Sequence, residues 1–249
     1  MTVPLPIPAR LLAGLLAAAL LLNGGTARAD GILWYNGDFD GRDALVNQTG
    51  AADGLVYDNF IVPTGSTFTI TAVFSNNLMY DPTAASTAYW EIRSGVSAGD
   101  GGTLVASGDG ADGVTATGRF EPVIPGVSNV YEYTNQVSVN VTLGAGTYWL
   151  AVAPDVSNQN SYISTTSGAN AVGSPAGNDG DSFVSSTFFG ANFTPTSDDS
   201  QEGPGTWDYS MGVIGTAAPT VPEPSSLLMG MVGLLASAGC LWSRRRALA

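Results

Sequence analysis

The stretch Val137-Ser138-Val139-Asn140-Val141-Thr142-Leu143 alternates apolar and polar residues with a period of two. Successive side chains of a β-strand point to opposite faces, so this stretch predicts a strand that buries three valines and a leucine. The segment from Tyr148 to Ala153 follows after Gly144-Ala145-Gly146. This short, glycine-containing link predicts that the two segments form a β-hairpin.

Similar short runs of Thr, Val, Tyr, Phe and Trp recur through the rest of residues 30–215, separated by Gly, Asn, Asp, Ser and Pro. No apolar stripe with a helical period is evident there. About ten strands of this kind predict an all-β fold, a single jelly-roll-like β-sandwich. One predicted strand buries Phe68, Ile70, Ala72 and Phe74 on one face. Further strands are expected within 89–93, 103–106, 114–120, 182–189 and 207–213. Loops are expected at 94–102, 107–113 and 158–181.

The N-terminus carries Arg10, then a short leucine- and alanine-rich segment from Leu11 to Leu22, then Ala27-Arg28-Ala29. A basic residue, a short apolar region and a small-x-small site together are typical of a secretory signal peptide. We expect residues 1–29 to be removed and the mature chain to begin near Asp30.

The charge of the predicted ectodomain is strongly negative. Its only basic residues are Arg42, Arg93 and Arg119, whereas Glu223 alone of the chain's 21 acidic residues lies outside it. The resulting net charge of about −17 excludes nucleic acid as a partner, because phosphate binding requires a basic surface. The single cysteine, Cys240, lies in the C-terminal tail, so the ectodomain is expected to contain no disulfide.

The C-terminal tail has three parts. Residues 216–224 form a proline-rich linker that ends in Pro222-Glu223-Pro224, residues 225–243 are largely apolar, and residues 244–249 begin with Arg244-Arg245-Arg246. The apolar core from Leu227 to Trp242 would span about 24 Å as a helix, so we expect a short transmembrane helix. The arginines after it predict a cytoplasmic tail and an ectodomain on the outer side of the membrane.

This arrangement resembles the PEP-CTERM sorting signal of mainly Gram-negative bacteria, and Pro222, Glu223, Pro224 and Arg244, Arg245 and Arg246 are the residues that match it. The resemblance implies that the tail is recognised by an exosortase, a membrane-embedded transpeptidase-like enzyme. It also implies transient anchoring in the inner membrane, followed by location at the cell envelope or outside the cell. Proteins with such tails are typical of bacteria that make an exopolysaccharide or biofilm matrix.

The composition of the ectodomain excludes most catalytic machinery. Without histidine or lysine, and with the only cysteine in the tail, the ectodomain cannot contain a Ser-His-Asp triad, a histidine-liganded metal or a Schiff base. Paired carboxylates, as in glycosidases, remain as the one alternative. Exposed aromatic side chains would also suit sugar rings, although strand spacing assigns most tryptophans and tyrosines to the core.

Calcium is the candidate cofactor, because it prefers several oxygen ligands around a tight turn. Asp38, Asp40 and Asp43 lie in a glycine-containing segment and are the predicted ligands. Two further acidic patches occur at residues 178–181 and 198–199. Asp, Asn and Gly also form ordinary turns, which is the alternative interpretation of all three segments.

These observations predict a non-enzymatic surface or extracellular-matrix protein with a structural or adhesive role in an exopolysaccharide layer. One alternative is a calcium-dependent carbohydrate-binding module. The other is a glycan-active enzyme that uses carboxylates, which would require a deep cleft holding two carboxylates with raised pKa values.

Overall fold

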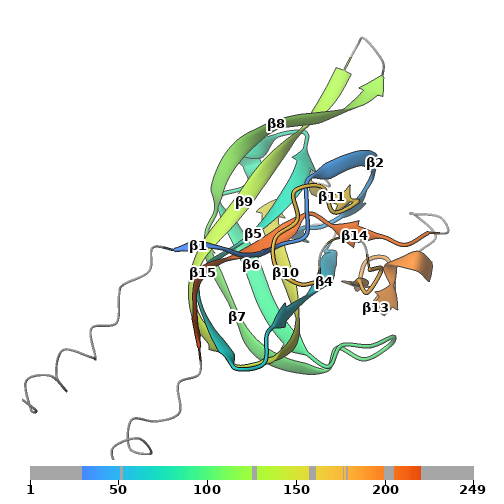
Figure 1. Cartoon of the computed structure of the whole chain (residues 1–249). Helices are drawn as coiled ribbons and strands as arrows, with labels where there is room; N and C mark the ends of the chain where they lie inside the picture. Colours follow the sequence, from blue (N-terminus) through green and yellow to red (C-terminus); the bar gives the residue numbers. More distant parts are fainter. Residues whose placement is uncertain are drawn as a thin grey trace, which may run out of the picture.

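The computed structural model describes residues 30–50, 53–124, 128–156, 161–175, 177, 179–198 and 205–219. These residues form two packed β-sheets with two single-turn 3-10 helices, Pro82–Ala84 and Thr196–Asp198 (Figure 1). The all-β, sandwich-like fold expected from the sequence is therefore confirmed. No helix among the described residues has the length and apolarity that crossing a bilayer requires. The predicted signal peptide, the apolar segment 225–243 and the basic tail 244–249 all lie outside the described residues.

The larger sheet has eight strands and is antiparallel. Its centre is the long strand β5, which pairs with β9 on one side and with β15 and β11 on the other. The eight strands are β1 (Gly31–Tyr35), β2 (Phe39–Val46), β5 (Ser66–Met79), β8 (Gly113–Ile124), β9 (Ser128–Leu143), β11 (Ser161–Thr166), β14 (Asp208–Tyr209) and β15 (Met211–Pro219).

The smaller sheet has seven strands in the order β13-β12-β4-β10-β6-β7, with β3 added beside β10. All its pairs are antiparallel except β3 with β10. Its strands are β3 (Thr49–Gly50), β4 (Leu55–Val62), β6 (Thr87–Ser94), β7 (Thr103–Ala111), β10 (Gly146–Val156), β12 (Phe183–Ser186) and β13 (Ala191–Pro195).

The main hydrophobic core lies between the two sheets. Trp34 of the larger sheet stacks on Phe60 of the smaller one, with ring centroids 5.5 Å apart, and both side chains are fully buried. As predicted for the stretch 137–143, Val137 and Leu143 are buried in this core, and the two intervening valines pack against it.

The predicted hairpin between 137–143 and 148–153 is wrong. β9 belongs to the eight-stranded sheet and β10 to the seven-stranded sheet, so the link at residues 144–145 crosses from one sheet to the other. Each strand already has hydrogen-bonded neighbours on both sides: β9 pairs with β5 and β8, and β10 pairs with β4, β6 and, at its end, β3. The two strands therefore contribute apolar side chains to the same core from opposite sides.

The buried face of β5 also differs from the prediction. Pairing shifts by one residue between Ile70 and Ala72, which leaves Thr71 as a β-bulge. A bulge reverses the alternation of side chains beyond it. Phe68, Ile70 and then Val73 consequently face the core, whereas Phe74 points to the outer face of the sheet.

Bulges lie side by side in neighbouring strands. β1 shifts its register against β15 between Ile32 and Trp34, and this shift lies next to the one that Thr71 makes against Ile214 and Gly215 of β15. The row of bulges bends the eight-stranded sheet, which curls away from the smaller sheet until its outer strands β2 and β8 line one cavity.

Two predicted loops contain strands. Residues 107–111 complete β7, which forms a hairpin with β6, and β11 lies within the expected loop 158–181. β7 is an edge strand, and glycines at positions 108 and 110 interrupt the apolar–polar alternation that predicts a half-buried strand. β15 continues to Pro219, so residues 216–219 of the expected linker belong to a strand.

Candidate metal centre

Three aspartates meet where the two sheets come together. Asp58 lies in the middle of β4, Asp208 begins β14, and Asp179 lies in the loop between β11 and β12. One carboxylate oxygen from each lies within 4.8 Å of the others. Because β4 belongs to one sheet and β14 to the other, this group joins both sheets and the loop.

The alternation of β4 points Asp58 inward. Val56, Phe60 and Val62 occupy the same face and belong to the main core, and Asp58 is fully buried among them. Its Oδ1 accepts a hydrogen bond from the Asn59 backbone N–H at 2.8 Å. Its Oδ2 accepts bonds from the Tyr209 N–H at 2.7 Å and from Asn36 Nδ2 at 2.8 Å.

Asp208, which is also fully buried, is held by the loop that carries Asp179. Its two oxygens accept hydrogen bonds from the backbone N–H groups of Asp179, at 2.5 Å, and of Gly180, at 2.9 Å. Gly180 has a φ of +73°, a conformation that glycine adopts without strain. The loop thus wraps its backbone around one carboxylate while it presents the carboxylate of Asp179 to the same point.

The group concentrates negative charge at the edge of the buried region, because Asp58 and Asp208 are fully buried and Asp179 is exposed. Among the described residues, the ion pairs formed by Arg42, Arg93 and Arg119 involve none of the three aspartates. Burial, together with the neighbouring charge of Asp208, raises the pKa of Asp58 well above its ordinary value. Burial and the charge of Asp179 raise the pKa of Asp208 to about 6. Protonation or a bound cation would relieve the repulsion between these carboxylates.

The donor atoms fit a hard divalent cation. Oxygens separated by up to 4.8 Å can share an ion whose metal–oxygen distances are about 2.3–2.6 Å, as for calcium. Asn36 Oδ1 and Asn59 Oδ1 are buried without a hydrogen-bond partner among the described residues, although their amide nitrogens donate to carboxylates of this cluster. Rotation of either amide would turn an oxygen toward the same centre. Asp58, Asp179 and Asp208 would hold the ion, with Asn36 and Asn59 as further oxygen donors.

The structure separates the ligands predicted from the segment 38–43. Asp38 accepts a hydrogen bond from Tyr35 Oη at 2.6 Å and pairs with Arg119 at 3.0 Å. Asp40 pairs with Arg42 at 2.5 Å and accepts a bond from Thr165. Asp43 lines a cavity on the outer face of the eight-stranded sheet. These contacts favour separate structural roles over a shared metal site.

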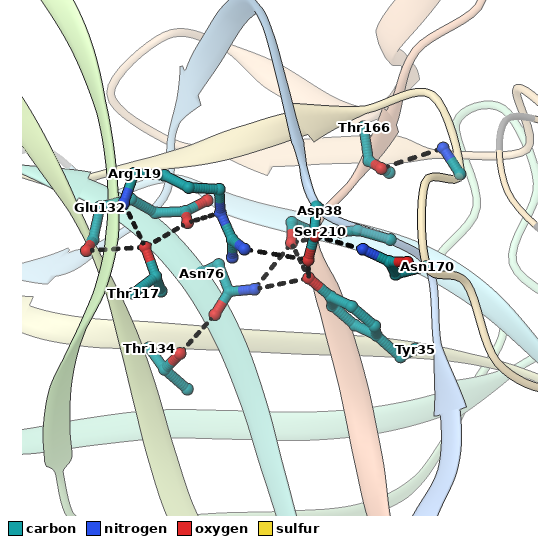
Figure 2. A network of polar contacts seen from close by, with 12 residues as sticks. Tyr35, Asp38, Asn76, Thr117, Arg119, Glu132, Thr134, Thr166, Asn170 and Ser210 are labelled. Atoms are coloured by element: carbon teal, nitrogen blue, oxygen red, sulfur yellow. Dashed lines mark hydrogen bonds and ion pairs between the residues drawn. The ribbon is translucent and has the colours of Figure 1, made fainter.

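Asp38 belongs to a polar network that crosses four strands of the larger sheet (Figure 2). Arg119 of β8 bonds to Glu132 of β9 at 2.5 Å and reaches Asp38 in the link between β1 and β2. Asn76 of β5 donates to Tyr35 Oη at 3.2 Å and to Ser210 at 2.8 Å. Figure 2 shows these side chains converging on one patch of the sheet.

A cavity of about 280 Å³ lies inside the curl of the same sheet. Asp43 and Glu121 line it together with Tyr80 and Tyr162, whose rings meet edge to face at 6.3 Å. Partial burial and the charge of Asp43 raise the pKa of Glu121. In this cavity two carboxylates face a common open space lined by the exposed Tyr80 and the half-buried Tyr162.

The other sequence-predicted features have clear positions. Trp34 and Tyr209 are fully buried and Trp90 and Trp149 almost so, which confirms that most aromatic side chains belong to the core. The sorting-motif residues 222–224 and 244–246 lie outside the described residues.

Sequence reasoning recognised only part of the metal centre. Asp179 belongs to the acidic patch 178–181, but Asp58 and Asp208 were not singled out. The sequence of β4 does indicate that Asp58 is unusual, because the alternation of Val56, Phe60 and Val62 places this carboxylate on the buried face of the strand.

No protein-family model matches the chain, and a comparison with curated proteins finds no similar sequence. The assignment of a function therefore rests on the chemistry of the chain and of its sites.

Proposed function

We propose that this chain is a non-enzymatic exported surface protein whose jelly-roll-like ectodomain is fastened by a calcium ion. The three-aspartate group carries the proposal, because it joins strands of both sheets and holds buried charge that no described arginine neutralises. Calcium suits these all-oxygen donors, and extracellular modules bind calcium with dissociation constants of about 10⁻⁴–10⁻³ M. A bound ion would take the place that disulfides occupy in many exported domains.

The signal peptide and the tail support location outside the cytoplasm. In this proposal the apolar segment 225–243 holds the protein in the inner membrane until an exosortase-type enzyme processes the tail at Pro222-Glu223-Pro224. The ectodomain then has a structural or adhesive role in the cell envelope or in an exopolysaccharide matrix.

Cell fractionation with surface proteolysis tests the sorting part of the proposal. In the native host, the protein is expected on the outer surface or in the medium, with a shortened C-terminus. Replacing Pro222, Glu223 and Pro224 by alanines should leave an unprocessed form in the inner membrane, whereas the exchange Pro219→Ala, which removes a proline just before the motif, serves as the control. An unchanged distribution of the first variant would contradict the role of the motif.

One observation favours the glycan-active enzyme as a second candidate. Asp43 and Glu121 line one open cavity, and the raised pKa of Glu121 is a property of a general acid. Release of reducing ends from the host's exopolysaccharide, lost on Glu121→Gln substitution, would support an enzyme. Absence of release at any pH between 4 and 8 would favour the non-enzymatic role.

A further inference from the structure

A second cavity, distinct from the metal centre and of about 370 Å³, opens on the outer face of the eight-stranded sheet. Strands β1, β5, β8, β9 and β15 all contribute side chains to it. It lies beside the row of bulges, because Ile32 and Ile214 border it at the residues where β1 and β15 change register. Cavities of this size accommodate small organic molecules or single units of a longer chain.

One wall of the cavity is apolar. Ile32, which remains 48% exposed, lines the cavity together with the largely buried ring of Phe74, which the bulge in β5 has turned to this face. Gly212 pairs with Phe74 across the sheet, and a Cβ at Gly212 would lie 2.6 Å from the phenyl ring. The absence of a side chain at Gly212 therefore leaves room for the ring of Phe74 at this wall.

The floor of the cavity is polar and fixed. Asn76 is almost fully buried, and its amide donates to Tyr35 Oη and Ser210 Oγ while its Oδ1 accepts a bond from Thr134 at 2.6 Å (Figure 2). Arg119 is held in place by Glu132 and Asp38. Side chains locked in this way lose little entropy when a ligand binds.

Hydrogen-bonding capacity remains at the mouth of the cavity. Within the described part of the chain, Arg119 Nη2 and the side-chain amide of Gln136 make no hydrogen bond, and both residues line the space. Gln136 is exposed and supplies both donors and an acceptor.

The charges disfavour an anionic ligand. The positive charge of Arg119 is already balanced by two carboxylates, Glu132 and Asp38, in a domain of strongly negative net charge. An anion in the cavity would be repelled by this negative potential.

We propose that this cavity binds one neutral sugar unit of a glycan chain. A neutral sugar ring combines an apolar C–H face, which matches Ile32 and Phe74, with a hydroxyl edge, which matches Gln136 and Arg119. The chain ends of the sugar leave through the open side of the cavity. This site is additional to the proposed calcium-fastened role, and would supply an adhesive function for it.

The test measures binding of the purified full chain, kept soluble in a detergent without a sugar headgroup, to a panel of neutral oligosaccharides. Oligosaccharides that contain uronic acids form the charged counterpart. Saturable binding to at least one neutral oligosaccharide is expected, at least tenfold tighter than to its uronate counterpart. Absence of neutral binding, or preference for uronates, would overturn the proposal.

A double variant, Ile32→Ala with Gln136→Ala, locates the binding. Both side chains are exposed, so folding should persist, as checked by the melting temperature. Binding is expected to fall at least tenfold, whereas Leu104→Ala, which removes a similarly exposed apolar side chain from β7, should leave it unchanged. Equal binding by both variants would refute the assignment. Thermal shifts with calcium on the same samples report separately on the metal centre, so either site can fail alone.

Discussion

Calcium is expected to stabilise the folded ectodomain at neutral pH and to lose this effect in acid. At a free calcium concentration one hundred times the dissociation constant, binding to the folded state alone adds about 2.7 kcal/mol to the free energy of unfolding. For a domain of about 190 residues, each kcal/mol raises the melting temperature by roughly 2–4 °C. Calcium in excess over chelator should therefore raise it by about 5–10 °C.

The pH dependence follows from Asp208, whose pKa is raised from 3.8 to about 6 on folding. The folded metal-free protein binds this proton more tightly than the unfolded chain does. The contribution of Asp208 to the free energy of unfolding is therefore complete below pH 4. This contribution, about 3 kcal/mol, is lost as the pH rises through 6. Protons compete with calcium for the same oxygens, so the calcium shift should be large at pH 7.5 and absent at pH 4.

Thermal unfolding followed by tryptophan fluorescence, with calcium and with chelator at each pH, measures these shifts. Asp208→Asn removes one carboxylate ligand and should abolish the calcium shift at pH 7.5. Asp109→Asn, at an exposed position of β7, removes the same charge outside the centre and should retain it. A calcium shift equal in both variants, or no shift in the natural protein, would refute the assignment of the metal centre.

Three further outcomes are expected. Phe60→Ala should lower the free energy of unfolding by about 3–5 kcal/mol in denaturant titrations, because it empties the fully buried contact with Trp34; a loss below 1 kcal/mol would contradict that packing. Glu132→Ala should cost about 2–4 kcal/mol in the same assay, since Arg119 loses its buried partner; full stability would show that the pair contributes little. Burial raises the pKa of Asp112 to about 6, so the metal-free fold loses stability from this group as the pH rises through that value. Asp112→Asn should therefore stabilise the protein by about 1 kcal/mol at pH 8, after discounting for partial exposure, and leave pH 4 unaffected; a stabilisation equal at both pH values would contradict ionisation as the cause.

The alternation of single strands was predictable, but the partners of those strands were not. Residues 137–143 show their buried face in the sequence, because the chemistry of each residue reports directly on its burial. Whether the next strand pairs with them or crosses to the other sheet depends on neighbours far away in the chain. The link at residues 144–145 fits either geometry, so local sequence could not decide between them.

The position of the three-aspartate group was not predictable from the sequence. The acidic, histidine-free composition predicts oxygen ligands, but the pattern of the sequence places them in the glycine-containing segment 38–43, where the carboxylates are close along the chain. Asp58, Asp179 and Asp208 are separated by up to 150 residues and are assembled only by the packing of the two sheets. Nearness along the chain is a poor guide wherever each ligand comes from a different strand or loop.

The bulge at Thr71 has a consequence for how relatives of this protein would be recognised. On its N-terminal side, every second residue of β5 is selected for packing between the sheets; on its C-terminal side, the opposite set is selected. A homologue without the bulge would be one residue shorter here, and aligning the two without a gap at Thr71 would compare core positions with surface positions. Homologues that keep the outer cavity should therefore conserve the length of this strand more strictly than the identity of its residues.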